Sequence, residues 1–418
     1  MQSSNLLKLF EIHTLDILNE KSNFNKRHFG YVKGTSTNDA CLVLKETIYK
    51  NIKYPNEEVY CLFVDLSKAF DKINHFLMGR ILTRRKFPPD LILFLMKYLR
   101  NQNARISWNG KKGNYFHINE GVRQGGILSP FLFKLYIDDI LDEIINTNVG
   151  CKLGFMQVNA LAYADDIVLI AKSQEDLEIL YRILSNGMSE RNLCINKIKT
   201  KCMIFKNSCR QRVAGNSIKL IEDEFEIVSQ YKYLGHILQD NLSDVCDVDL
   251  RLNAFYGKFN WVYRNFKHVN IEVLYFLFTS FCLPDYGLSL WNLWELNSKV
   301  VFKTFKVAFS NALKKILNVS MTMSSHGVAE IFSQLLFNPY VILVQIRYFK
   351  RIFNSLNPFI KNLKFYIKNG YLYRTLSKSF KETYGCDILS NDLDALRARL
   401  LWVQNHEPRT GRPVTYST

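Results

Sequence analysis

The sequence lacks the cysteine pairs that organise small metal-dependent or disulfide-rich domains. Its nine cysteines form no CxxC pair, and none has a histidine nearby at zinc-finger spacing. This excludes a zinc-finger module and a Cys/His knuckle. Free or buried thiols in a reducing compartment are the expectation that remains.

Long apolar runs are also missing. The most apolar window, residues 273–294, is interrupted by Pro284 and Asp285, so we expect it in a protein core and not in a membrane. The start of the chain shows no secretory signal pattern, and we find no internal repeat and no low-complexity linker. We therefore expect an intracellular protein of the nucleus, the cytoplasm or both, not secreted and without a membrane partner.

Acidic residues are few for the number of basic ones. The 418 residues carry a net charge of +17, with +6 in residues 1–244 and +11 in residues 245–418. Between Lys299 and Lys381 there are 14 basic residues and one acid, Glu330, interleaved with Phe and Tyr. Basic surface with aromatic platforms favours a nucleic-acid partner, although a general basic surface or an anionic membrane would suit the charge too.

The segment 160–172, ALAYADDIVLIAK, is the centre of the chain's organisation. Two apolar, β-prone arms flank Asp165 and Asp166, which predicts a hairpin with both carboxylates at its tip. Adjacent carboxylates repel each other unless a cation lies between them, and Mg²⁺ is the usual ion for phosphate chemistry. Taken alone, a solvated Asp-Asp turn is the simpler interpretation.

A third carboxylate, Asp65, ends another buried strand, predicted over residues 59–65 from a nearly continuous apolar run. The order of strand, helix, strand, hairpin, helix and strand up to residue 205 predicts a split β-α-β sheet with acids at one edge. Three such carboxylates form a ligand set for two cations that act on a phosphoryl transfer. Beyond Asp244 the apolar spacing predicts an all-helical remainder.

Local signals add three expectations. A helix is predicted from Lys68 to Arg84, and another to about Arg100. In GVRQGGILSP, three glycines over residues 121–126 predict a loop where backbone approaches another group closely. Ser129 is expected to cap the helix that Pro130 opens.

At this point the chain resembles reverse transcriptases of non-LTR (LINE-type) retrotransposons. FVDLSKAFDKINH, GVRQGGILSPFLF, YADD, NKIKTKCMIF and YKYLGHIL resemble their successive palm motifs, and HFGYVKGTST is similar to the preceding segment. FCLPDYGLSLW and the helices after it resemble the thumb. The resemblance covers about residues 5–345. It implies a right-hand polymerase fold of class α+β, with a ferredoxin-like βαββαβ palm and fingers remnant (1–241), a helical thumb (242–345) and a basic C-terminal extension (346–418).

The resemblance also implies roles for single residues. Asp65, Asp165 and Asp166 match the catalytic, metal-binding aspartates, with two Mg²⁺ (or Mn²⁺) as cofactors. Phe70 matches the ring that excludes a 2′-OH, although packing alone would also explain it. Lys199 matches the lysine proposed to protonate pyrophosphate, although a solvated helix end is the simpler interpretation. The other matches are Lys68, Ala69, Gln124 and Gly125 for the nucleotide, and Tyr233, Leu234 and Gly235 for the primer grip.

The resemblance thus implies an RNA-directed DNA polymerase acting on an RNA template, a DNA primer and dNTPs, with no protein partner indicated. An upstream R-P-I-S segment and an endonuclease are missing, so we expect a truncated copy, a domesticated protein or part of a polyprotein. Two alternatives stay open. One is a catalytically weak or dead descendant that binds RNA or RNA–DNA hybrid, and the other is a maturase-like RNA-folding factor.

Overall fold

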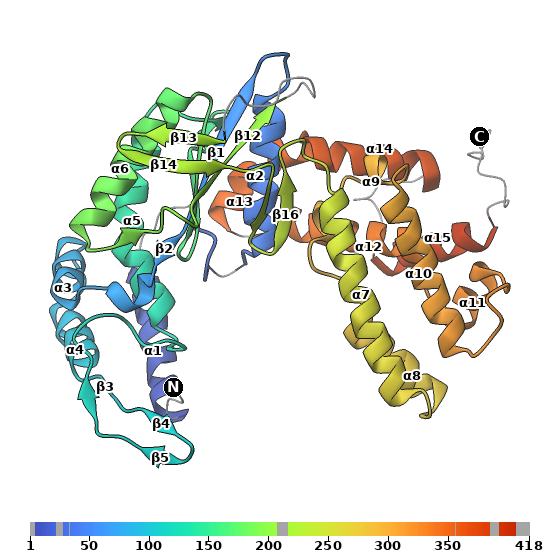
Figure 1. The fold of residues 1–418 in the computed structure, drawn as a ribbon, viewed down its shortest axis with the longest axis horizontal. Helices are drawn as coiled ribbons and strands as arrows, with labels where there is room; N and C mark the ends of the chain where they lie inside the picture. Colours follow the sequence, from blue (N-terminus) through green and yellow to red (C-terminus); the bar gives the residue numbers. More distant parts are fainter. Residues whose placement is uncertain are drawn as a thin grey trace. The chain divides into compact units, whose positions relative to one another are not determined.

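The computed structural model describes residues 5–21, 28–32, 34–206, 216–355, 357–384 and 393–406. The chain divides into two compact units, residues 1–229 and 230–418, and each is described by itself (Figure 1). The polar end of the sequence, HEPRTGRPVTYST, lacks core residues, which predicts a mobile end. Residues 407–418 of it lie outside the described part.

A six-stranded sheet forms the centre of the first unit, in the order β13-β14-β12-β1-β10-β9. Strand β1 pairs antiparallel with both β10 and β12, and β10 pairs antiparallel with β9. Numbered in chain order, the four adjacent strands β12, β1, β10 and β9 therefore run 4-1-3-2. This confirms the expected split β-α-β arrangement. The strands are β1 (Glu58–Val64), β9 (Ala160–Tyr163), β10 (Asp166–Ala171), β12 (Lys201–Lys206), β13 (Ser217–Leu220) and β14 (Asp223–Ile227).

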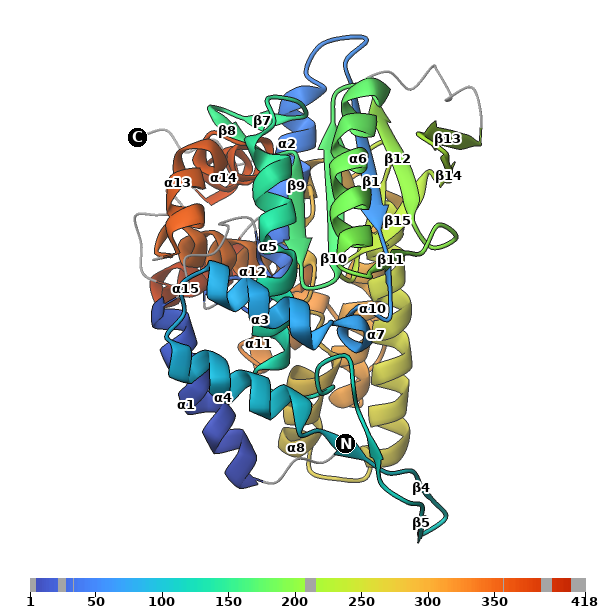
Figure 2. The ribbon, with the colours of Figure 1, turned by 90° about the vertical axis from the view of Figure 1, so that its left-hand side faces the viewer.

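Helices cover both faces of this sheet. Figure 2 shows α5 (Ser129–Asn146) and α6 (Gln174–Glu190) on one side of the strands and α2 (Thr37–Asn51) on the other. Successive residues of β1 point to opposite faces of the sheet, so Leu62 and Val64 share one face and join the core formed with α5 and α6. The ends of β1 and β10 are thereby held firmly at one edge of the sheet.

The remaining elements of the first unit are short or peripheral. They are α1 (Asn5–Lys21), β2 (Leu66–Ser67), a 3₁₀ turn (Ala69–Lys72), α3 (His75–Arg84), α4 (Pro89–Arg100), β3 (Asn103–Ala104), β4 (Ser107–Trp108), β5 (Lys111–Lys112), β6 (Phe116–His117), β7 (Lys152–Leu153), β8 (Met156–Gln157) and β11 (Cys194–Ile195).

Two local predictions for this unit are wrong. The helix expected from Lys68 is a 3₁₀ turn that ends at Lys72, and α3 starts only after Asn74, whose side chain accepts a hydrogen bond from the Leu77 amide (3.0 Å). Ser129 is the first residue of α5 and not its cap. Its hydroxyl donates a hydrogen bond to the Arg123 carbonyl, which fastens the preceding loop instead.

The second unit begins with a hairpin and is otherwise helical, as predicted beyond Asp244. The hairpin joins β15 (Gln230–Tyr233) to β16 (His236–Gln239). Phe255 packs against Phe278, Phe305 and Phe309 in an aromatic core. The helices are α7 (Val245–Phe266), α8 (Ile271–Leu277), α9 (Leu293–Leu296), α10 (Val300–Ile316), α11 (Ser325–Ile331), α12 (Phe337–Phe353), α13 (Pro358–Lys368), α14 (Tyr371–Tyr384) and α15 (Leu393–His406).

Among the described residues, no helix is both long enough and apolar enough to span a membrane. The apolar window 273–294 forms α8, a π-helical turn (Phe278–Cys282) and the short elements after it. Leu274, Phe278 and Leu290 of this window are buried in the second unit, as expected for core.

Candidate active site

The aspartate hairpin has tighter geometry than the sequence suggested. Tyr163 pairs with Asp166, so the two-residue turn consists of Ala164 and Asp165, and Asp166 is already the first residue of β10. The prediction that both aspartates form the tip is therefore wrong by one residue. Ala164 has φ 56°, a left-handed conformation that costs an L-residue about 1–2 kcal/mol. The side chains of Asp165 and Asp166 leave the turn from consecutive positions.

Asp65 reaches the same edge from the neighbouring strand. The last residue pair of the β1–β10 ladder joins Val64 to Ile167, so Asp65 and Asp166 each lie one residue beyond it. This antiparallel register, set by buried apolar pairs, brings together carboxylates that are 100 residues apart in the chain.

The electrostatics of the three aspartates show that they affect one another. Desolvation raises the pKa of Asp165, and the charge of Asp65 raises it further. Desolvation, followed by the charges of Asp165 and Asp65, raises the pKa of Asp166 to about 6. Like charges held together at a sheet edge disfavour ionisation, and a cation would relieve that cost.

The hairpin turn is supported by a segment that precedes α2. The Phe29 amide donates a hydrogen bond to the Ala162 carbonyl (2.9 Å), and Gly30 lies directly against the turn. A Cβ atom at Gly30 would meet the Ala164 amide nitrogen at 2.5 Å and the Tyr163 carbonyl carbon at 3.0 Å. Only glycine fits there without moving the turn. This contact of Gly30 with the aspartate hairpin was not predicted from the sequence.

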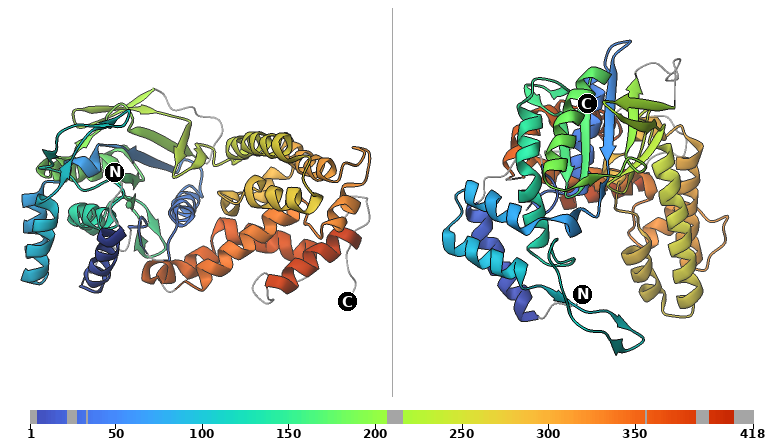
Figure 3. Two further views of the ribbon diagram at one scale, coloured as in Figure 1. Left: turned by 90° about the horizontal axis from the view of Figure 1, so that it is seen from below. Right: turned by 60° about the vertical axis from the view of Figure 1, so that its left-hand side comes forward.

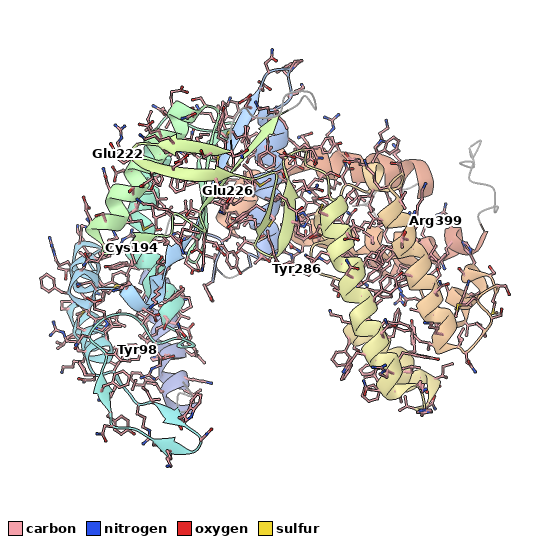
Figure 4. All side chains as sticks on the ribbon, viewed as in Figure 1. Tyr98, Cys194, Glu222, Glu226, Tyr286 and Arg399 are labelled. Atoms are coloured by element: carbon pink, nitrogen blue, oxygen red, sulfur yellow. The ribbon has the colours of Figure 1, made fainter. Side chains whose placement is uncertain are left out.

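Lys199 belongs to a turn that is attached to Asp65. The Asn196 amide donates to the Asp65 carbonyl (2.8 Å), and the Asp65 amide donates to the Thr200 hydroxyl (3.2 Å). The Asn196 side chain accepts from the Lys199 amide (3.2 Å), which shapes the N-x-x-K turn. The Lys199 side chain is exposed, so it is available to a ligand at this edge. Nearby, Cys194 of β11 (labelled in Figure 4) pairs with Ser67.

The residues expected to contact a nucleotide follow Asp65 directly. Lys68 is exposed and left-handed (φ 51°), whereas Ala69 is buried. Phe70 is half-buried and its ring stacks on Phe133 of α5, with centroids 4.8 Å apart. Its carbonyl accepts a hydrogen bond from the Val122 amide (2.8 Å). Phe70 is therefore held in a fixed position, which suits both packing and a steric role.

The glycine-rich loop docks against this segment. A Cβ atom at Gly121 (φ 85°) would lie 2.7 Å from the Asp71 carbonyl oxygen, so this position requires glycine. Gly125 is left-handed (φ 78°), and Gln124 beside it is exposed. At Gly126, a Cβ atom would lie 2.8 Å from the Ser129 hydroxyl oxygen. The close backbone approach predicted for this loop is thus present within the protein itself.

Glu11 of α1 is a site-supporting residue that the sequence did not reveal. It is buried, and its carboxylate accepts hydrogen bonds from the Ile127 amide (2.7 Å) and from the Tyr98 hydroxyl (2.5 Å; Tyr98 is labelled in Figure 4). It ties the first helix to the end of the glycine-rich loop. No local signal marks Glu11, because α1 also carries the acids Asp16 and Glu20.

The donor set at this edge fits a divalent cation. Carboxylate oxygens are the ligands that Mg²⁺ prefers, and the raised pKa values of Asp165 and Asp166 show charge that a cation would stabilise. In this structure, however, the three side chains do not form a ligand cluster. Across the described ranges, no three His, Cys, Asp or Glu side chains are grouped closely enough to hold a metal ion.

The predicted primer-grip residues form the hairpin turn of the second unit. Tyr233 is buried and pairs with His236, and the turn residues Leu234 (φ 45°) and Gly235 (φ 80°) are both left-handed. Such a type I′ geometry suits the twist of a hairpin, but Leu is unusual in it. The Leu234 carbonyl accepts from the Tyr286 hydroxyl, and the side chain of Tyr286 is labelled in Figure 4.

A buried ionic cluster fastens this hairpin to α7. The His236 ring lies 3.3 Å from the Asp247 carboxylate and 3.4 Å from that of Asp244. Asp247 also accepts from the Trp291 indole (2.8 Å) and pairs with Arg251, which donates to the Gly235 carbonyl (2.6 Å). Burial alone would raise the pKa of Asp247, but the His236 and Arg251 charges and these hydrogen bonds hold it well below its usual range.

Not all basic side chains between Lys299 and Lys381 are exposed on the surface of the second unit. Lys314 is buried and donates a hydrogen bond to the Met321 carbonyl (2.9 Å), so it is a structural residue. Lys306 lies over the Phe302 ring and donates to the Asn297 side chain (3.1 Å). Lys314 therefore does not contribute to a basic surface on this stretch.

These features belong to one known class of protein. The family model described as reverse transcriptase (RNA-dependent DNA polymerase) matches residues 2–238, more than half of the chain. The chain belongs to the reverse transcriptase family. The resemblance to non-LTR retrotransposon polymerases is thereby confirmed, and the 4-1-3-2 sheet agrees with the palm that this family implies.

Its relatives are polymerases of retrotransposable elements. The R2 Pol polyprotein of Nasonia vitripennis is 30% identical over 168 residues, which cover 40% of this chain and 16% of the relative. The jockey RNA-directed DNA polymerase of Drosophila melanogaster is 26% identical over 285 residues, 64% of this chain and 29% of the relative. The chain thus spans less than a third of the length of either.

A solved structure of apo telomerase from Candida tropicalis is also similar. It is 12% identical, with a TM-score of 0.39, over 95% of this chain and 61% of that one. Because both values are low, no conclusion rests on this likeness.

Proposed function

We propose that this protein is an RNA-directed DNA polymerase, which extends a DNA primer with dNTPs on an RNA template. The carrying observation is the convergence of Asp65, Asp165 and Asp166 on one sheet edge, where two of them have raised pKa values. Neighbouring carboxylates with pKa values raised by burial and by one another's charge are typical of functional sites. Family membership supports the same activity.

In the proposed reaction the primer 3′-OH attacks the α-phosphate of a dNTP, and pyrophosphate leaves. Asp65, Asp165 and Asp166 would hold two Mg²⁺ or Mn²⁺, which supply charge stabilisation for the attacking and leaving oxygens. We assign to Lys199 the transfer of a proton to the departing pyrophosphate, because its turn is hydrogen-bonded to the Asp65 backbone. Proton donation at this point typically contributes a factor of about 10²–10⁴.

Nucleotide selection is assigned to the residues around the glycine-rich loop. Phe70, stacked on Phe133, would exclude a ribose 2′-OH sterically, and Lys68 and the Ala69 backbone would approach the triphosphate. Gln124 and Gly125, both exposed, would contact the incoming nucleotide. The rigid stack supports this role for Phe70, since a mobile ring would discriminate weakly.

The other assignments concern the nucleic acid. Tyr233, Leu234 and Gly235 would position the primer end, and the basic helices would bind phosphates of template and primer. We accordingly assign residues 1–241 to fingers remnant and palm, 242–345 to the thumb and 346–418 to a basic extension. No observation on the described residues favours the alternative of an inactive nucleic-acid-binding protein.

Primer extension on an RNA template tests the proposal. Wild type should add dNTPs in Mg²⁺, whereas Asp165→Asn should lose on the order of 10³-fold or more in rate, since one ligand is removed. Asp90→Asn, which changes an exposed aspartate in the first turn of α4, is the matched control. Salt-dependent binding of RNA without incorporation by wild type would instead identify the inactive binding protein.

A further inference from the structure

A second feature of the first unit has no place in the proposed chemistry. Between α4 and the glycine-rich loop, β4 and β5 form a hairpin that extends away from the rest of the unit (Figures 2 and 3). Its turn residues Asn109 (φ 46°) and Gly110 (φ 77°) are both left-handed, and Asn-Gly is the preferred sequence for such a turn. The Gly113 amide closes it by donating to the Ile106 carbonyl (2.8 Å).

The hairpin and the residues that follow it expose large apolar side chains. Trp108 is 77% exposed, Ile106 68%, Tyr115 67% and Phe116 51%. Leaving so many rings in water is unfavourable, and none of these four side chains is needed to fill the core of the unit. Exposed aromatic groups clustered on one projecting element indicate a binding surface.

The charge of the segment specifies the kind of partner. From Lys97 to His117 the sequence contains five Lys or Arg residues and no Asp or Glu. A peptide partner would have to be acidic, whereas any nucleic acid supplies the complementary charge at every phosphate. The absence of acids on this segment therefore favours nucleic acid.

The aromatic rings and the basic side chains of this segment also lie close together in space. The β4–β5 register sets Trp108 directly opposite Lys111, and residues opposite each other in a strand pair share a face. The Arg105 guanidinium lies over the Tyr115 ring, 4.9 Å from its centroid. Proteins bind single-stranded nucleic acid with this combination: the ring stacks on a base, and the neighbouring cation contacts a phosphate. Bases within a duplex are already stacked on each other and offer no free face.

We propose that the β4–β5 hairpin is a binding site for single-stranded nucleic acid, with Trp108 stacking on a base and Lys111 contacting a phosphate. Binding itself follows from the hairpin alone. Only the identity of the strand, the unpaired RNA template, rests on the proposed polymerase function. Tyr115 and Arg105 would provide a second stacking position.

Fluorescence anisotropy with a labelled single-stranded RNA of about 20 nucleotides, without dNTPs, tests the site on the full chain. Trp108→Ala should weaken binding about 5-fold to 100-fold, and Trp108→Phe should restore most of it. Lys111→Ala should flatten the slope of log K against log salt by about 0.7. Tyr54→Ala is the matched control, because Tyr54 is also exposed (61%) and has Lys53 over its ring at 5.4 Å.

The outcomes separate this site from the polymerase activity. Loss of RNA binding by Trp108→Ala with Tyr54→Ala unaffected supports the site, even if wild type fails to incorporate a nucleotide. Binding of Trp108→Ala that equals the Tyr54→Ala control overturns it, even if wild type is an active polymerase, and would turn attention to an acidic protein partner. An equal loss for blunt duplex and single strand would contradict the stacking role of Trp108.

Discussion

Replacing Asp166 by Asn removes one of the repelling carboxylates while keeping the shape of the side chain. The raised pKa of Asp166, about 6 against an ordinary 3.8, means that the folded protein resists ionisation at this position. Each pKa unit corresponds to about 1.4 kcal/mol, so the full cost would be about 3 kcal/mol. Because the side chain is partly exposed, solvent screening reduces the expected cost to about 1 kcal/mol.

The pH dependence follows from the direction of the shift. With the folded pKa above the unfolded one, the stability that Asp166 contributes is fully present below pH 3.8 and is lost as the pH rises through about 6. Above pH 6, Asp166→Asn should therefore unfold about 2–4 °C higher than wild type in a chelating buffer. Near pH 3.8 the difference should disappear.

Thermal unfolding followed by circular dichroism from pH 3.8 to about pH 8 measures this difference. Mg²⁺ should raise the unfolding temperature of wild type more than that of Asp166→Asn, since the cation relieves the same repulsion. Asp90→Asn should show neither effect. A parallel pH profile for wild type and Asp166→Asn would refute the reasoning.

Three further predictions follow from individual contacts. Gly30→Ala should lower the rate of nucleotide incorporation at least tenfold, because a Cβ atom would meet the Ala164 backbone at 2.5 Å. Its circular dichroism should stay native-like, and an unchanged kcat would contradict the support of the turn by Gly30. Phe70→Ala should lower the ratio of kcat/KM for dNTP over rNTP, and an equal ratio in an active variant would make Phe70 a packing residue only. Asp247→Ala should lower the free energy of unfolding of the second unit by about 3–5 kcal/mol, measured in urea, since His236 and Arg251 lose their buried partner. A decrease of less than about 1 kcal/mol would contradict that role.

Local pattern predicted the parts of the site that lie on regular strands. A nearly continuous apolar run with a terminal acid was enough to place Asp65 at the end of β1, and apolar arms predicted the hairpin of β9 and β10. The error of one residue at Ala164 has a physical reason. A left-handed alanine in a turn is disfavoured locally, and it is held there by contact with Gly30, which no local pattern records.

Contacts between distant segments escaped prediction. The Glu11 carboxylate accepts a hydrogen bond from the Ile127 amide, 116 positions further along the chain. Helix α3 starts late because the Ile73 carbonyl accepts a hydrogen bond from the Gly121 amide. A buried acid or a shortened helix is determined by what packs against it, and the sequence of the segment alone does not contain that partner. The roles of Lys199, Gln124 and the turn at Gly235 remain predictions for the same reason.

The most direct test of the central claim is single-nucleotide incorporation on an RNA template–DNA primer, measured for wild type and Asp65→Asn side by side at saturating enzyme. The convergence of Asp65 with Asp165 and Asp166 predicts extension by wild type in Mg²⁺ and a loss on the order of 10³-fold for Asp65→Asn, with RNA binding unchanged. Equal extension by both proteins would contradict the assignment of these carboxylates. No extension by wild type, with tight binding of the template–primer, would contradict the polymerase itself.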